Sequence, residues 1–242
     1  FKGLLAFHAR RGIPGVEAID EQGYRRSFVI EGEPGWVGVS SIEGDTALRL
    51  RVHYVRPLYL GRLVNQVRRM FDVDADPVTI MQALRRDQRL RPLVNRWPGQ
   101  RLPGALDGFE LGVRAILGQQ ISVAVARTLA ARIVERFGTA HQASAAVGLG
   151  ALFPPPAALA DAPLESIGLT RARAATVRGL AQACIDGRID FSAAQTLTET
   201  VTRLCALRGI GMWTAQYIAM RAHSHPDAFP AGDLVLRKIA GE

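Results

Sequence analysis

The stretch LRGIGMWTA (residues 207–215) places two glycines inside a region whose apolar spacing is otherwise helical. Gly209 and Gly211 can both adopt positive φ, and the helix expected to begin near Met212 would offer unpaired N–H groups and the positive end of its dipole. Two helices joined by such a turn form a phosphate site. An ordinary helix–helix turn has the same local sequence, so the choice depends on the rest of the chain.

The composition is that of a globular protein with a basic surface. The chain has 242 residues, 48% of them hydrophobic, and a formal net charge of +8. That charge suits an anionic partner such as nucleic acid. No apolar run reaches the roughly 18 residues of a membrane span, and the segment from Phe1 does not resemble a signal peptide. We therefore expect a soluble, cytoplasmic protein without a membrane partner.

Two periodicities divide the chain. Apolar and polar residues alternate in YRRSFVIEG, WVGVSSIEG and ALRLRVHYV (24–32, 36–44 and 47–55), which predicts about three antiparallel strands. Helical spacing precedes these segments and returns after them. The sequence therefore predicts an α+β fold, with a mixed α/β domain and a small antiparallel sheet over 1–76, followed by a mostly α-helical region over 77–242.

The helical region has several internal landmarks. Residues 77–104 are expected to hold a helix and a connector, with the Pro/Gly-rich stretch 91–104 not helical. A helical core over 105–222 contains the hairpin 207–211, and a last segment covers 223–242. FPPPAAL is predicted to be a rigid turn, and no strand is expected in the last hundred residues.

Separated motifs occur in an order that indicates a family. RLPGALDGFELGVRAILGQQISV (101–123) precedes GIGMWTAQYIAMRA (209–222), and HPDAFPAGDLVLRK (225–238) then puts Asp233 on a Pro/Gly loop. This arrangement resembles DNA-3-methyladenine glycosylase II, a bacterial alkylation-repair family of the helix-hairpin-helix superfamily that is sometimes fused to a regulator. The resemblance runs from Phe1 to the end, but the family normally continues for a few more helices, so we expect a chain truncated at its C-terminus.

The resemblance implies that Asp233 is the catalytic residue. The family flips a damaged nucleotide out of the duplex and cuts the bond between base and deoxyribose. A base alkylated on a ring nitrogen is already cationic and leaves without a general acid, so one carboxylate that stabilises an oxocarbenium-like sugar and orients a water suffices. Asp233 could also cap the helix of LVLRK (234–238), and the two roles are compatible.

The residue at position 213 bears on strand cleavage. Superfamily members that also nick the strand use a lysine two residues after the last glycine of the hairpin, where this chain has Trp213. The only lysines, Lys2 and Lys238, lie outside the motif, so a Schiff-base route has no evident nucleophile. We expect a monofunctional glycosylase that leaves an abasic site.

Aromatic residues are expected to line the base pocket. Trp213 and Tyr217 are four residues apart and share one helix face. The resemblance assigns both to the pocket and adds Phe7 from the first domain. An aromatic face attracts a cationic base by about 0.5–2 kcal/mol, which favours alkylated bases without reading one hydrogen-bond pattern. Aromatic residues that merely fill the core are the alternative.

The resemblance also implies contacts with double-stranded DNA. The loop LGQQIS (117–122) would push a side chain into the gap left by the flipped base: Gln120 by its position, or Ile121 as an apolar wedge, unless the loop is only structural. The DNA-binding hairpin would comprise Leu207, Arg208, Gly209, Ile210, Gly211, Met212 and Thr214.

Metal chemistry has little support in the sequence. Cys184 and Cys205 are the only cysteines, so the four-cysteine set of an iron–sulfur cluster is missing, and no cofactor is expected to be required. The resemblance implies a structural Na⁺ or K⁺ on the main-chain carbonyls of Cys205, Leu207 and Ile210.

A second functional hypothesis is that the protein is not an enzyme. A non-catalytic helix-hairpin-helix module, binding DNA or sensing damage within a fused regulator, explains the charge and the hairpin, but it leaves Asp233 and the aromatic pair without a purpose. We expect a monomer that acts on duplex DNA with alkylated bases.

Overall fold

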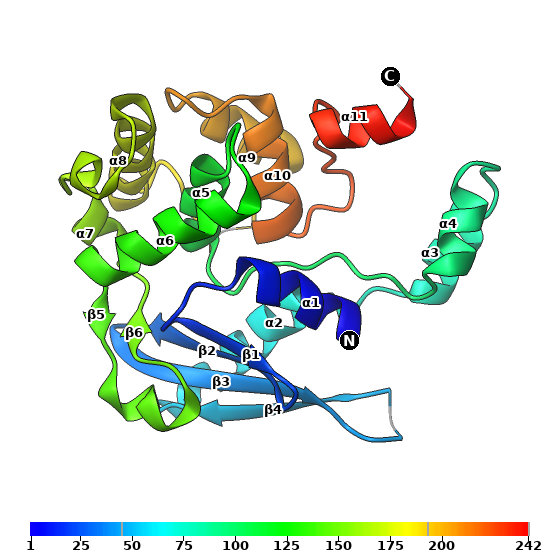
Figure 1. Ribbon diagram of the computed structural model, residues 1–242, viewed down its shortest axis with the longest axis horizontal. Coiled ribbons are helices and arrows are strands. Elements are labelled where there is room, and N and C mark those ends of the chain that lie inside the picture. The colour runs from blue at the N-terminus through cyan, green and yellow to red at the C-terminus, as the bar shows by residue number, and fades with distance from the viewer. Residues whose placement is uncertain (45, 193, 242) are drawn as a thin grey trace.

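The computed structural model of the chain describes residues 1–44, 46–192 and 194–241. An antiparallel sheet lies at one end of the molecule and most of the helices lie at the other (Figure 1). The α+β fold predicted from the sequence is confirmed. Among the described residues, no helix is both long enough and apolar enough to cross a membrane.

The sheet is a meander in which each strand pairs with the next in the chain. On the last strand, Leu48, Leu50 and Val52 are half-buried and the residues between them are exposed, as their alternation predicts. The prediction of three strands missed the first one, because a four-residue strand is too short for a clear alternating pattern. The strands are β1 (Glu17–Asp20), β2 (Gly23–Ile30), β3 (Glu33–Ser41) and β4 (Leu48–His53).

Two helices lie between the sheet and the helical end of the molecule (Figure 1): α1 (Lys2–Arg11) and α2 (Leu60–Met70), which a short 3₁₀ turn, η1 (Pro57–Tyr59), precedes. Leu4 of α1 and Leu63 of α2 pack with Tyr24 and Phe28 of the sheet in the first hydrophobic core. α1 contacts β1 on one side and α6 of the helical region on the other. It therefore joins the two parts of the molecule.

The second hydrophobic core lies among the remaining helices and surrounds α5, which is buried along most of its length. α5 packs against α6, α8 and α10. The elements that follow α2 in the chain are α3 (Pro77–Leu84), α4 (Leu90–Arg96), α5 (Gly108–Leu117), α6 (Val123–Phe137), β5 (Thr139–Ala140), η2 (Gln142–Val147), β6 (Ala151–Leu152), α7 (Pro156–Leu159), η3 (Leu164–Ile167), α8 (Arg171–Ile185), α9 (Leu197–Cys205), α10 (Met212–Ala222) and α11 (Leu234–Ala240). Of these, α3 and α4 have no buried residue and pack against each other, apart from the second core.

Three predictions in this region are wrong. The stretch 91–104 is not a pure connector, because α4 runs into it; Pro92 lies in the first turn of α4, where a backbone N–H would have no helical partner and a proline costs little. FPPPAAL is not only a turn, since Pro156 begins the short helix α7. The last hundred residues do contain a strand, β6, which pairs with β5.

A histidine is buried in the first core, on α1. His8 is 4% exposed, its ring centre lies 4.9 Å from that of Tyr24, and its Nε2 has no hydrogen-bond partner among the described residues. Burial, more than any charged neighbour, lowers the pKa of His8 from 6.5 to about 4. The folded protein therefore resists protonation of this ring.

We predict that His8 makes the protein less stable in mild acid. Because the unfolded chain binds a proton near pH 6.5 and the folded chain only near pH 4, the free energy of unfolding falls as the pH falls between these values. The fall attributable to His8 is at most about 3 kcal/mol, at about 1.36 kcal/mol per pKa unit. Urea unfolding at several pH values should show a flatter dependence for His8→Leu, with His53→Leu, an exposed position, behaving as wild type. An equally steep fall in His8→Leu would contradict the assignment.

Candidate active site

The hairpin between α9 and α10 is built around one glycine at which any other side chain would be strained. Gly209 has φ +90°, and a Cβ there would lie 2.0 Å from Oγ1 of Thr176 on α8. Gly211 instead has φ −92° and ψ 176°, so of the two glycines only Gly209 uses the positive φ that is open to both. The reason is that Gly211 is the N-cap residue of α10, a position that favours extended backbone.

The hairpin divides into a buried half and an exposed half. The side chains of Leu207, Ile210 and Thr214 are buried, whereas Arg208, Gly209, Gly211 and Met212 lie at the surface. No side chain among the described residues caps the N-terminus of α10. The first N–H groups of α10 therefore remain available to an anion.

A cavity of about 960 Å³ opens beside the hairpin, and both parts of the molecule line it. Trp213 and Tyr217 form one wall; their rings are stacked, with centres 5.4 Å apart and planes 16° apart. Phe7 of α1 lines the same cavity from the first domain. Sequence reasoning placed all three in one pocket, and the structure brings them together.

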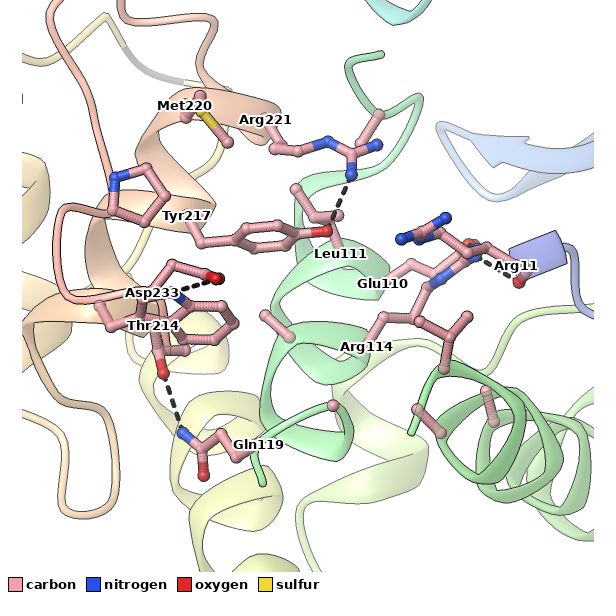
Figure 2. Close-up of a pocket in the computed structure, with 18 of the residues that line it drawn as sticks. Arg11, Glu110, Leu111, Arg114, Gln119, Thr214, Tyr217, Met220, Arg221 and Asp233 are labelled. Atoms are coloured by element: carbon pink, nitrogen blue, oxygen red, sulfur yellow. Dashed lines mark hydrogen bonds and ion pairs between the residues drawn. The ribbon is translucent and has the colours of Figure 1, made fainter. Parts of the chain in front are cut away.

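Asp233 lies on the same side of this cavity as Tyr217 (Figure 2). Its Oδ2 accepts a hydrogen bond of 3.0 Å from Nε1 of Trp213. Its Oδ1 accepts bonds from the backbone N–H groups of Val235 (2.9 Å) and Leu236 (3.1 Å), so Asp233 is also the N-cap of α11. Three donors hold the carboxylate in one orientation, and one of its roughly four acceptor sites stays free.

The loop between α5 and α6 lies at the edge of the cavity. Gln120 is exposed and has φ +56°, a left-handed conformation that is uncommon for residues other than glycine. Ile121 is half-buried and packs against the second core. Of the two predicted wedge residues, Gln120 therefore has the side chain that is free to reach outward.

Arg221 was not found from the sequence, although it belongs to the cavity. It is 6% exposed, and its Nη1 donates to the hydroxyl of Tyr217 at 2.8 Å. Its guanidinium carbon lies 4.5 Å from the ring centre of Phe7, and that of Arg11 lies 4.0 Å from the same ring. Protein cations thus already contact the aromatic wall that Phe7 contributes.

A buried cluster of charged residues forms another side of the cavity, where Figure 2 shows Glu110 and Arg114 near Arg11. Arg26 of β2 donates to Glu110 of α5 at 2.6 Å, and both side chains are less than 5% exposed. Arg114 donates to Glu110 at 2.9 Å and to Glu17 of β1 at 2.8 Å. These four residues are called the ion cluster below, and they connect the sheet to the helical core.

The pKa of Glu17 reports the strength of that pairing. Burial disfavours its charged form, but Arg114, Arg26 and the hydroxyl of Tyr24 outweigh burial and lower the pKa of Glu17 to about 2. One signal in the sequence could have revealed the cluster, because Glu110 and Arg114 are four residues apart on an otherwise apolar helix. Their partners on β1 and β2 are too distant in the sequence to infer.

The comparisons with known proteins agree with this architecture. Residues 1–107 match the AlkA N-terminal domain, and residues 113–242 match the HhH-GPD superfamily of base excision DNA repair proteins. The chain belongs to the HhH-GPD superfamily. Its pocket thus combines a wall from an AlkA-type N-terminal domain with walls from an HhH-GPD domain.

Individual relatives cover nearly all of this HhH-GPD chain. A probable bifunctional transcriptional activator/DNA repair enzyme AlkA of Mycobacterium tuberculosis is 35% identical over 99% of the chain and 48% of its own length. The DNA-3-methyladenine glycosylase 2 of Escherichia coli is 30% identical over 97% of the chain and 81% of its own length. The solved 3-methyladenine DNA-glycosylase from Archaeoglobus fulgidus has a TM-score of 0.83 at 25% identity, covering 99% of this chain and 81% of that one. The chain thus spans about half the length of the mycobacterial relative.

The ion cluster should be essential for stability. Glu110→Gln removes the charge that pairs with Arg26 and Arg114 and leaves a buried guanidinium uncompensated, so we predict a loss of about 3–5 kcal/mol in the free energy of unfolding. Glu165→Gln is the matched control: it breaks an Arg–Glu pair of 2.8 Å at the surface, where solvent screens the charges, so the free energy of unfolding should fall much less. Equal losses of unfolding free energy in the two variants, measured by chemical denaturation, would show that burial of the cluster does not add to stability.

The two hairpin glycines should respond differently to alanine. Gly209→Ala forces a Cβ into Thr176 and strains the left-handed backbone, so we predict a lower melting temperature and weaker binding to duplex DNA. Gly211→Ala adds a Cβ with no atom within 4 Å at an extended position and should change the melting temperature little. Thermal unfolding and fluorescence anisotropy with a labelled duplex measure both effects. A Gly209→Ala protein that behaves like Gly211→Ala would refute this account of the turn.

Proposed function

We propose that the protein is a monofunctional DNA glycosylase that excises alkylated bases of the 3-methyladenine type, across a broad range, from duplex DNA. The observation that carries the proposal is the position of Asp233, which is hydrogen-bonded to Trp213 and lines the same cavity as the stacked pair Trp213 and Tyr217. Membership of a superfamily of base excision DNA repair proteins supports it.

Binding would begin at the DNA backbone. The exposed turn at Arg208 and Gly209, with the uncapped N-terminus of α10, can accept a phosphate, and the net charge of +8 favours an anionic partner. Gln120 would fill the gap that the extruded nucleotide leaves in the duplex. The flipped base would enter the cavity between the aromatic walls from the two domains.

The chemistry would be hydrolysis of the N-glycosidic bond. As that bond breaks, its electron pair leaves with the alkylated base, and the base needs no proton because it is already cationic. Positive charge develops on the sugar, where the free acceptor site of Asp233 can stabilise it and orient the water that attacks C1′. As the C1′–O bond forms, the water gives up a proton to the carboxylate of Asp233, which then releases it to solvent. The indole N–H of Trp213 and the cap of α11 hold that carboxylate in place, so the capping role serves the catalytic one.

Several properties belong to the same proposal. Trp213 occupies the position of the strand-nicking lysine, so the product would be an abasic site in an intact strand. The protein would act as a cytoplasmic monomer and require no cofactor. A structural Na⁺ or K⁺ would be held by the main-chain carbonyls of Cys205, Leu207 and Ile210, because neutral oxygens suit such ions. The Leu207 carbonyl accepts the N–H of Ile210 at 3.1 Å and keeps a second lone pair. A non-catalytic DNA-binding module would leave the arrangement around Asp233 unused.

Asp233→Asn tests the catalytic assignment. Asparagine caps helices as well as aspartate does, so the melting temperature should change little, whereas release of methylated base from alkylated duplex should fall by about 10²-fold or more. Asp227→Asn, an exposed position on the same loop, is the matched control and should release base at the wild-type rate. Equal release by Asp233→Asn and wild type would exclude Asp233 from catalysis. No release by wild type would instead favour the non-catalytic module.

A further inference from the structure

We propose that Gln119 is a positioning residue that couples the hairpin (207–211) to the loop 117–122, called the wedge loop below. The two segments would then move as one rigid unit, so that binding of the DNA backbone and filling of the gap in the duplex occur together. This inference rests on the proposed function, since it assigns work to the same site. Gln119 directly precedes Gln120, and its side chain is hydrogen-bonded to the hairpin.

The amide of Gln119 reaches across to the hairpin at two points. Its Nε2 donates to the carbonyl of Gly209 at 3.0 Å and lies 2.9 Å from Oγ1 of Thr214, the contact drawn as a dashed line in Figure 2. An NH₂ group carries two hydrogens, so both bonds can form together. Gly209 is the left-handed residue of the turn and Thr214 lies in the first turn of α10. One side chain thus spans both halves of the phosphate site.

Helix α8 contacts both the wedge loop and the hairpin. Nη2 of Arg173 donates to the backbone carbonyl of Gln119 at 2.7 Å, and Thr176, one turn further along α8, lies where a Cβ on Gly209 would be. The wedge loop and the hairpin, 90 residues apart in the sequence, therefore rest on the same face of the same helix. Their relative position is fixed by contacts with α8 and by the amide of Gln119.

The backbone of Gln120 shows why such support is needed. A non-glycine residue at φ +56° is held in a sparsely populated conformation that persists only where its surroundings enforce it. Gln120 itself is exposed, while Gln119 makes four hydrogen bonds, two through its side chain, one through its carbonyl and one through its backbone N–H to the carbonyl of Ile116. The bonds of Gln119 thus hold the strained backbone conformation of its neighbour Gln120.

The test must separate base extrusion from chemistry. Gln119→Met keeps the length of the side chain and removes its N–H donors. We expect single-turnover release of a methylated base paired in duplex DNA to slow by about 10-fold or more, the effect of about one lost hydrogen bond. When the same base lies opposite an abasic-site analogue, extrusion costs less, and the rate should stay within about 2-fold of wild type. Affinity for undamaged duplex should also stay within about 3-fold.

Control variants distinguish the loss of the Gln119 hydrogen bonds from a general destabilisation of the fold. Gln182→Ala deletes an exposed glutamine on α8 that bonds only Asp186 at 2.8 Å among the described residues, and it should match wild type on both substrates. Thr214→Val should slow base release from the paired substrate as Gln119→Met does, whereas Thr214→Ser, which keeps the hydroxyl, should release base at about the wild-type rate. The double variant of Gln119→Met with Thr214→Val should release base no more slowly than Gln119→Met alone. These Thr214 variants also decide the question if Gln119→Met does not fold.

Two results would overturn the proposal: equal slowing of Gln119→Met on both substrates, or a wild-type rate on the paired substrate. If the wild-type protein releases no base, the glycosylase proposal fails by itself. Fluorescence of 2-aminopurine placed beside the methylated base then reports extrusion without chemistry. A weaker increase with Gln119→Met than with wild type supports the coupling, and an equal increase refutes it.

Discussion

Arg26 of the sheet and Glu110 of α5 form a buried ion pair at the junction between the two parts of the molecule. Arg26 and Glu110 are almost completely removed from water, so neither can lose its partner without leaving a buried charge. Because Arg26 comes from the sheet and Glu110 from the central helix α5, their pairing fixes the orientation of the first domain on the second. The cavity forms along this junction, so Phe7 and Tyr217 line the same cavity only when the junction is intact.

Several side chains at the site each make more than one of the contacts that shape it. Asp233 caps α11, accepts the indole N–H of Trp213 and still keeps an acceptor site toward the cavity. Arg221 holds the hydroxyl of Tyr217 and lies over Phe7. Gln119 connects two loops that would meet the DNA at different points. Such sharing makes the site rigid, and rigidity is what electrostatic stabilisation of a short-lived sugar cation needs.

The features that could be predicted from the sequence are those that depend on a local residue pattern or on the order of motifs. Alternation identified three of the four strands of the main sheet, and the glycines of the hairpin located the start of α10 at Met212. The resemblance to the glycosylase family assigned Asp233, Trp213 and Tyr217 to one site, and all three line the same cavity. The sequence could not tell which glycine of the hairpin takes a positive φ, because an N-cap glycine and a left-handed glycine look alike. The helix α4 was missed because a proline stops a helix only beyond its first turn.

What the sequence could not reveal depends on pairs that are distant along the chain. Arg26 and Glu110 are 84 residues apart, and Gln119 and Gly209 are 90 apart, so neither contact has a local signature. Arg221 looks like an ordinary basic residue near the end of α10, and only burial beside Tyr217 and Phe7 distinguishes it. Polar residues on mostly apolar helices are the one hint that such buried contacts exist.

The products of the reaction distinguish a site that removes a base and leaves the strand intact from one that also cuts the strand. A labelled duplex with one methylated base should yield free base and an intact strand that breaks only on treatment with alkali, and borohydride should trap no covalent complex with the protein. A strand nicked before alkali, or a trapped adduct, would show that the protein is not a monofunctional glycosylase.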